Sequence, residues 1–144
     1  MIAIDSNILI YAHRQDSKWH RPALHSIDRL IAQSGFWAIT RQSAHEFISI
    51  STHPRIYSPP STLEEAIAQM EVWMSAPNFR ILGETSSHWE ELKTLALHGQ
   101  IVGPLIHDAR IAAICLQHGV SELWTANRDF SRFPKLKTRN PLVG

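Results

Sequence analysis

The sequence predicts an α/β fold in which a central, mostly parallel sheet of short strands is covered by helices on both faces. Short apolar runs rich in β-branched residues alternate along the chain with longer segments of helical periodicity, which is typical of such sheets. Acidic residues directly follow two of the apolar runs, at the edge where parallel sheets bind ligands. The chain has 144 residues and is 44% hydrophobic, which suits one compact domain over residues 1–144.

The first third of the chain is expected to form two strands and three helices. The strands are expected at residues 1–4 and 36–40, and the helices at residues 8–12, 22–33 and 41–51. Pro22 suits the first turn of the second helix, along which Leu24, Ile27 and Leu30 repeat at helical spacing.

The remaining chain is expected to alternate in the same way. Helices are expected at residues 61–74, 87–98 and 105–118, and strands at residues 79–82, 120–125 and, as an edge strand, 136–138. Ser61 and Glu64 match a capping box at the start of the first of these helices, and Gly119 suits the end of the last. Trp89 is expected to face the core, as large aromatic side chains do by default.

The composition excludes several classes of protein. A formal net charge of +1 rules out a strongly polybasic chain. No run approaches the ~20 apolar residues of a membrane-spanning helix. The apolar start lacks a basic leader, so we expect a strand rather than a signal peptide, and a cytoplasmic location. Cys115 is the only cysteine, which excludes an intrachain disulfide and a thiolate zinc site.

Four carboxylates occupy positions where an ionised acid would destabilise the fold unless a cation or a hydrogen-bond donor binds it. Asp5 ends the first apolar run, and Asp129 follows a later strand-like segment. Asp108 flanks the apolar stripe in the first turn of its expected helix, and Glu46 lies within the helix expected at residues 41–51. A buried carboxylate is usually neutralised, paired or metal-bound. Acids gathered from distant parts of a chain are how a hard cation such as Mg²⁺ is held. The pattern therefore predicts a metal-dependent phosphoryl-transfer site.

Each acid also has an ordinary structural explanation. Asp5 can cap a helix or form a turn, and Asp108 can stabilise a helix N-terminus by ~0.3–1 kcal/mol. Glu46 lies off the centre of the apolar face of its helix, as a solvated glutamate does. Asp129 can be a turn acid paired with Arg128 or Arg132.

The segments around these acids resemble the PIN domain family, and in particular its VapC-type toxin ribonucleases. The similarity covers essentially the whole chain and depends on the order and spacing of the segments together. The matching segments are Ile4-Asp5-Ser6-Asn7-Ile8-Leu9, Ser43-Ala44-His45-Glu46-Phe47, His107-Asp108-Ala109-Arg110-Ile111-Ala112-Ala113, Leu123-Trp124-Thr125-Ala126-Asn127-Arg128-Asp129-Phe130 and Asn140-Pro141-Leu142.

The resemblance implies a three-layer α/β/α sandwich with four or five short strands, and three or four acids around Mg²⁺ or Mn²⁺. Asp5, Glu46 and Asp108 match family acids directly. The family often has Asp where this chain has Asn127, so either Asp129 fills the fourth position or the site uses three acids. The resemblance also implies an RNA substrate, a cognate antitoxin protein that covers the site, and often a homodimer.

Four further residues are candidates for contact with substrate. Ser6 and Thr125 can hydrogen-bond a carboxylate or a phosphate oxygen, and turn capping explains them equally well. Asn127 can hold a metal-bound water or supply an amide oxygen. Arg128 opens the most basic stretch, residues 128–139, which is either a solvated tail or a contact for the nucleic-acid backbone.

The sequence thus predicts a metal-dependent endoribonuclease that acts as the toxin of a type II toxin–antitoxin pair. The alternative is a non-catalytic PIN-fold module that binds RNA or protein, because Asn127 removes a charge that the family usually places there. A phosphatase or phosphotransferase with Asp5 as covalent nucleophile is disfavoured. The haloacid dehalogenase motif that begins this way requires a second Asp where this chain has Asn7.

Overall fold

Five parallel strands form the centre of the molecule in a computed structural model, which describes residues 1–143. Gly144, the last residue of the expected domain, lies outside the described residues. The strand order is β3-β2-β1-β4-β5, and every neighbouring pair is parallel. The first strand of the sequence is therefore the central strand of the sheet. The strands are β1 (Ile2–Ile4), β2 (Trp37–Thr40), β3 (Phe79–Leu82), β4 (Glu122–Trp124) and β5 (Thr138–Arg139).

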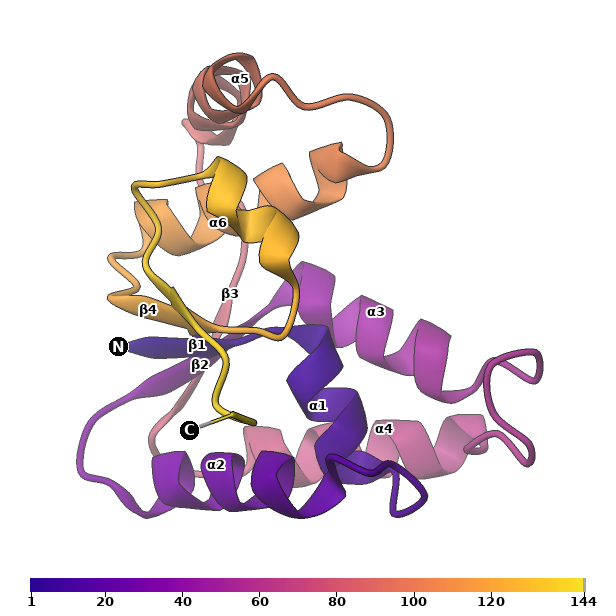
Figure 1. Cartoon of the computed structure of the whole chain (residues 1–144). Coiled ribbons are helices and arrows are strands. Elements are labelled where there is room, and N and C mark those ends of the chain that lie inside the picture. Colours follow the sequence, from indigo (N-terminus) through magenta and orange to yellow (C-terminus); the bar gives the residue numbers. More distant parts are fainter. Residues whose placement is uncertain (144) are drawn as a thin grey trace.

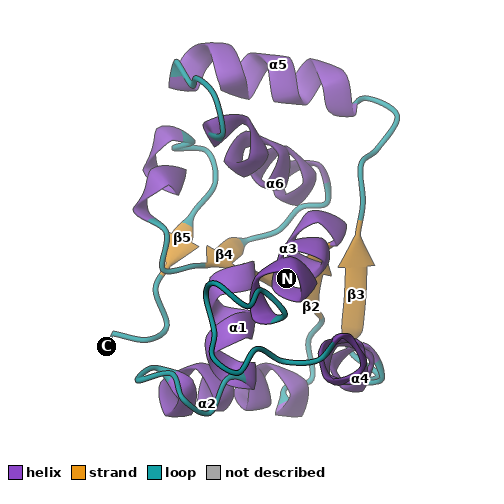
Figure 2. Cartoon of the chain, turned by 90° about the vertical axis from the view of Figure 1, so that its right-hand side faces the viewer, coloured by secondary structure: helices purple, strands orange, loops and turns teal. Residues whose placement is uncertain are grey.

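Helices cover both faces of this sheet. Figure 1 shows α5 and α6 above the strands and α2 and α4 below them, and Figure 2 shows the same layers from the side. The predicted three-layer α/β/α class is confirmed. The helices are α1 (Ser6–His13), α2 (His20–Ala32), α3 (Arg41–Ser51), α4 (Leu63–Met74), α5 (His88–Gly99), α6 (Leu105–Gln117) and the short 3-10 helix η1 (Arg128–Arg132).

The core is divided by the sheet into two apolar clusters. Within β1, Ile4 packs into the cluster shared with α1, α2, α3 and α4, whereas Ala3 packs into the cluster shared with α5, α6 and η1. Successive strand residues point to opposite faces of the sheet, so a strand of three residues contributes side chains to both apolar clusters. Cys115 of α6 is buried, and burial raises the pKa of its thiol to about 12, as befits a small apolar core residue. In residues 1–143 no helix is long and apolar enough to cross a membrane.

The predicted capping box of α4 is wrong by one residue. Thr62 caps the helix, its side chain accepting the backbone N–H of Glu65, and the Glu65 side chain accepts the backbone N–H of Thr62. Ser61 is engaged elsewhere, because its hydroxyl lies 2.9 Å from Nε2 of His13 and 3.3 Å from Nη1 of Arg14. Tertiary contacts therefore decide which of two adjacent hydroxyl residues caps the helix.

Two further expectations are corrected. Trp89 is 67% exposed, because α5 packs mainly on α6, with the buried Leu95 on its covered face. The edge strand begins later than expected, at Thr138. Leu136 instead lies in a turn, where its side chain is buried and its N–H donates to the carbonyl of Phe133 at 3.0 Å.

Candidate active site

Three of the four candidate acids come from three elements that meet at the carboxyl edge of the sheet. Asp5 follows β1 directly and caps α1, with extended backbone angles (φ −81°, ψ 160°) that turn the chain from strand to helix. Thr40 ends β2 and caps α3 in the same way, which brings Glu46 to the second turn of α3. Asp108 lies in the first turn of α6.

Four hydrogen bonds fix the carboxylate of Asp5, which is 3% exposed. Oδ1 accepts the backbone N–H of Ser6 at 2.8 Å and the hydroxyl of Ser43 at 3.4 Å. Oδ2 accepts the hydroxyl of Thr125 at 2.8 Å and the side-chain amide of Asn7 at 3.1 Å. Donors from α1, from α3 and from the segment after β4 therefore orient this single acid.

Asn127 connects the end of β4 to the acid on α6. Its backbone N–H donates to the Thr125 hydroxyl at 3.0 Å, and its side-chain amide donates to Oδ2 of Asp108 at 3.4 Å. Its Oδ1 accepts the backbone N–H of Asp129 at 2.9 Å. Asn127 thus donates a hydrogen bond to Asp108 and stabilises the turn that carries Asp129.

Glu46 is held by two side-chain donors. Oε2 accepts the hydroxyl of Ser6 at 3.3 Å, and Oε1 accepts the side-chain amide of Gln42 at 3.2 Å. Ser6 therefore joins two acids, because its N–H donates to Asp5 and its hydroxyl to Glu46.

Burial and neighbouring acids raise the pKa values of Asp5 and Asp108. Burial raises the pKa of Asp5 to about 6, the charges of Glu46 and Asp108 add to the rise, and the hydrogen bonds from Thr125 and Ser6 oppose it. The pKa of Asp108 is also raised, first by burial and then by the charges of Asp129 and Glu46. Like charges that raise each other's pKa in this way form a centre of uncompensated negative charge.

The donor set is chemically suited to a hard divalent cation, because it consists of carboxylate and amide oxygens. It is not a ready-formed cage. Over the described part of the chain, no three His, Cys, Asp or Glu side chains are grouped so that they could hold a metal ion. Neutral donors, namely Ser6, Asn127 and Gln42, hydrogen-bond to the carboxylates instead. The acids would have to turn toward a shared ion to bind it.

Comparison with known proteins identifies the fold family. A family model for the PIN domain matches residues 2–136. The chain belongs to the PIN domain family. Ribonuclease VapC43 of Mycobacterium tuberculosis is 30% identical over 144 residues, which cover 100% of this chain and 97% of the relative.

Solved structures share the PIN fold at lower identity. FitAcB from Neisseria gonorrhoeae superposes with a TM-score of 0.72 at 15% identity, over 100% of both chains. A chain of a toxin–antitoxin complex from Klebsiella pneumoniae gives a TM-score of 0.64 at 20% identity, over 98% of both chains. These similarities confirm the predicted family and fold class.

The structure joins most of the predicted site residues in one hydrogen-bonded network. Asp129 is exposed on η1 and reaches this network through its backbone N–H and through its effect on the pKa of Asp108. Arg128 is exposed beside it. The joined residues are Asp5, Ser6, Glu46, Asp108, Thr125 and Asn127.

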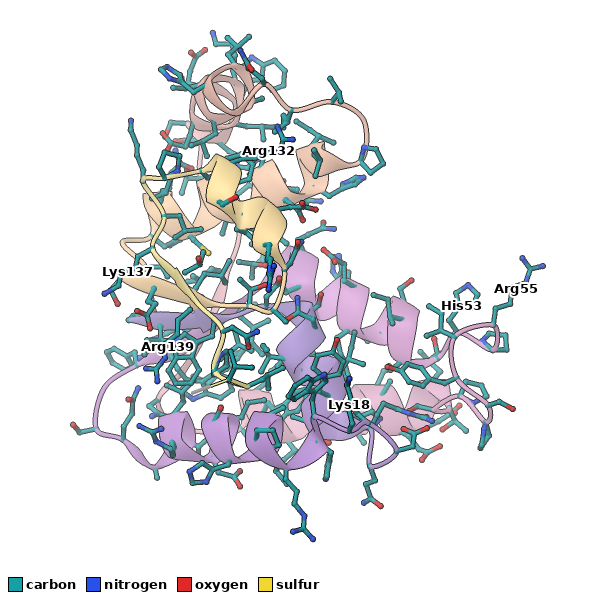
Figure 3. The ribbon with its side chains drawn as sticks, viewed as in Figure 1. Lys18, His53, Arg55, Arg132, Lys137 and Arg139 are labelled. Carbon is teal, nitrogen blue, oxygen red and sulfur yellow. The ribbon has the colours of Figure 1, made fainter. Side chains whose placement is uncertain are left out.

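The basic stretch at residues 128–139 does not gather at the acids. Figure 3 places Lys137 and Arg139 on the side of the molecule where the N-terminus lies, away from α3. Lys137 pairs with Glu122 at 3.6 Å, and Arg132 donates to the carbonyl of Gly99 at 3.2 Å. The segment diverges because it leaves the site as η1 and then runs along the sheet edge as β5.

Three residues that hold the acids of this PIN domain were not singled out from the sequence. Asn7 lies two positions after Asp5 and resembles an ordinary turn residue, yet its Oδ1 also accepts the backbone N–H of Ala126 at 3.0 Å. Ser43 stands in the first turn of α3, where its N–H bond to Thr40 resembles simple capping. No local sequence pattern marks Gln42 as a residue of the site.

Proposed function

We propose that this PIN domain is a metal-dependent endoribonuclease that hydrolyses RNA phosphodiester bonds as the toxin of a type II toxin–antitoxin pair. One observation carries the proposal: a single network of hydrogen bonds joins Asp5, Glu46 and Asp108 at the carboxyl edge of a parallel sheet. Burial and then the neighbouring acids raise the pKa values of Asp5 and Asp108. The full-length similarity to a protein named as a ribonuclease supports RNA as the substrate class.

We assign Mg²⁺ or Mn²⁺ to Asp5, Glu46 and Asp108, with Asp129 at the margin of the site. Such an ion, when bound, lowers the pKa of a coordinated water and offsets the negative charge that develops on the attacked phosphate. Two features support the assignment: every charged donor is a carboxylate, and the charge of Glu46 acts on both Asp5 and Asp108, whose pKa values are raised chiefly by burial.

The protein's own side chains prepare the acids for this task. With a pKa of about 6, the Asp5 carboxyl group is mostly ionised at neutral pH, as a metal ligand must be. Thr125, Asn7 and Ser43 donate to it and fix its direction. Arg128, exposed on η1, is placed to contact the RNA backbone, a contact that positions the strand without reading its sequence.

The direct test is cleavage of RNA by the purified chain with and without a divalent cation. We expect cleavage with Mg²⁺ or Mn²⁺, loss of cleavage in EDTA, and loss of cleavage in Asp108→Asn with the cation present. Electrophoresis of a defined RNA resolves the products. Equal cleavage in EDTA would falsify the metal-dependent mechanism.

We also propose a cognate antitoxin and a homodimer. The similarity to a chain of a toxin–antitoxin complex supports the first partner. Co-expression with the adjacent open reading frame should yield a complex in which RNA cleavage is inhibited. Light scattering of the free chain tests the proposed homodimer, and a monomer at micromolar concentration would contradict it.

A non-catalytic binding module is the second candidate. It is favoured by Asn127, which places a neutral amide beside Asp108, and by the lack of a ready-formed cluster of ligands among residues 1–143. Calorimetry separates the candidates, because the module predicts no binding of Mn²⁺ at millimolar concentration.

A further inference from the structure

A path of hydrogen bonds leads from the candidate site across the surface of α3 and α6. Oε1 of Glu46 accepts the side-chain amide of Gln42 at 3.2 Å. Oε1 of Gln42 in turn accepts Nη1 of Arg110. Nε of Arg110 donates to Oε1 of Glu84 at 2.7 Å. Four side chains from α3, α6 and the segment after β3 are thereby connected in series.

The order of donors and acceptors along this path is set by Arg110. A glutamine amide has one accepting and one donating end, whereas a guanidinium group only donates. Because Arg110 contacts the oxygen of Gln42, the nitrogen of the same amide must face Glu46. With the amide reversed, two acceptors would face each other at Glu46, and the carboxylate would lose that support.

We propose that Arg110 and Gln42 are positioning residues, which fix the Glu46 carboxylate for a divalent cation. The proposal rests on the proposed function, since it takes Glu46 as part of the cation site. Glu84 completes the arrangement. It binds the guanidinium group of Arg110 at 2.7 Å and so limits the orientations in which that group can reach Gln42.

Simple electrostatics and this proposal predict effects of opposite sign. Arg110 carries a positive charge near a site for a cation, so removing that charge should strengthen cation binding by Coulomb's law. If Arg110 acts through Gln42, its removal should instead weaken cation binding, because Glu46 is no longer held. Outer residues that orient metal ligands typically contribute ~10–100-fold to affinity.

The experiment is calorimetric titration of the full chain with Mn²⁺. The variants are Arg110→Gln, Gln42→Leu and the double variant, and Lys93→Gln is the matched control. Lys93 loses the same charge from an exposed pair with Glu90 on α5, 2.9 Å apart. We expect each single variant to bind Mn²⁺ ~10-fold more weakly or worse, the double variant to bind no more weakly than the singles, and the control to match the wild type.

A second measurement separates positioning from loss of fold. The kcat for RNA cleavage should fall in Arg110→Gln while KM stays constant, and Arg110→Lys, which keeps a donor for Gln42, should restore part of the Mn²⁺ affinity. If Arg110→Gln does not fold, thermal unfolding will show it, and Gln42→Leu then carries the test alone.

Several outcomes overturn the inference. Unchanged or tighter Mn²⁺ binding in Arg110→Gln would assign Arg110 a purely electrostatic effect, and additive losses in the double variant would show that the two residues act separately. A wild-type chain that binds Mn²⁺ but leaves RNA intact would overturn the ribonuclease proposal and not this one. A wild-type chain that binds no Mn²⁺ would overturn both.

Discussion

The two ends of helix α1 hold two polar clusters that differ in how their charges are balanced. At the N-terminal end, Asp5 is buried near Glu46 and Asp108, and its pKa is raised. At the C-terminal end, Arg14 binds Asp16 at 2.7 Å, and the hydrogen bond from Arg14 lowers the pKa of the Asp16 carboxyl group. The first cluster contains several negative charges and, among these residues, no positive partner, whereas in the second the charges of Arg14 and Asp16 neutralise each other.

The second cluster has a structural task. Arg14 donates to the carbonyl of Pro59 at 3.0 Å and to the hydroxyl of Ser61 at 3.3 Å, and it lies 4.2 Å from the centroid of the Tyr57 ring. It therefore fastens the loop before α4 to the end of α1. A hollow of about 550 Å³ lies at this cluster, yet nothing there calls for a ligand. The residues that line this hollow include none of the acids of the proposed site.

The largest expected effect follows from removing the buried acid. Asp5→Asn should reduce RNA cleavage by more than ~100-fold, because even residues one step removed from a metal ligand contribute ~10–100-fold. Asp16→Asn is the matched control, since it makes the same replacement at the other end of α1 and should leave cleavage unchanged. Initial rates of cleavage with Mg²⁺ measure both. Similar losses of cleavage in Asp5→Asn and Asp16→Asn would contradict the functional difference between the two clusters.

The next effect concerns stability and pH. The pKa of Asp5 is raised from 3.8 to about 6, so the folded chain binds this proton more tightly than the unfolded chain does. The free energy of unfolding of the metal-free protein should therefore fall as the pH rises from about 4 to about 6, by about 3 kcal/mol for a shift of this size.

Urea unfolding in EDTA over this pH range tests the effect against Asp5→Asn, in which the fall should be smaller because only the raised pKa of Asp108 remains. The lowered pKa of Asp16 acts in the opposite direction, since the stability it contributes is lost as the pH falls. Parallel pH profiles for the wild type and Asp5→Asn would contradict the assigned shift.

A smaller effect is expected at the compensated cluster. Arg14→Met should lower the free energy of unfolding by ~2 kcal/mol, within the range for lost hydrogen bonds of a charged group, because the Arg14 side chain is only 11% exposed. Cleavage by the folded variant should not change. A variant that unfolds normally but cleaves poorly would place Arg14 in the functional site instead.

The smallest expected change sharpens the comparison at the acidic end. Asn127→Asp adds a fourth charge beside Asp108 and removes the amide that donates to it. We expect Mn²⁺ to bind a few-fold more tightly, and the metal-free fold to be slightly less stable. Calorimetry measures the change in Mn²⁺ affinity, and thermal unfolding measures the change in stability. Weaker binding of Mn²⁺ would show that the amide itself serves the site.

The acids could be predicted from the sequence because local patterns mark them. Asp5 directly follows a strand, and Asp108 lies in the opening turn of an apolar helix. Gln42 and Arg110 could not be found in this way. They are 68 residues apart, and their contact depends on how α3 packs against α6, which no local pattern encodes.

The fold class was predictable for a similar reason, and its details were not. Alternating apolar runs and helices indicate a covered parallel sheet. Whether Ser61 or Thr62 caps α4 depends on His13, which lies 48 residues from Ser61. The exposure of Trp89 depends on how much of α5 its neighbours cover.

The position of β1 has a consequence for protein synthesis. Strand β1 occupies the middle of the sheet, and its neighbour β4 is synthesised more than a hundred residues after it. Thr125, the hydroxyl that binds Asp5, is separated from it by 120 residues. A nascent chain that stalls before this point has no complete acidic centre. The RNA cleavage proposed for this PIN domain would therefore require synthesis of the chain through β4.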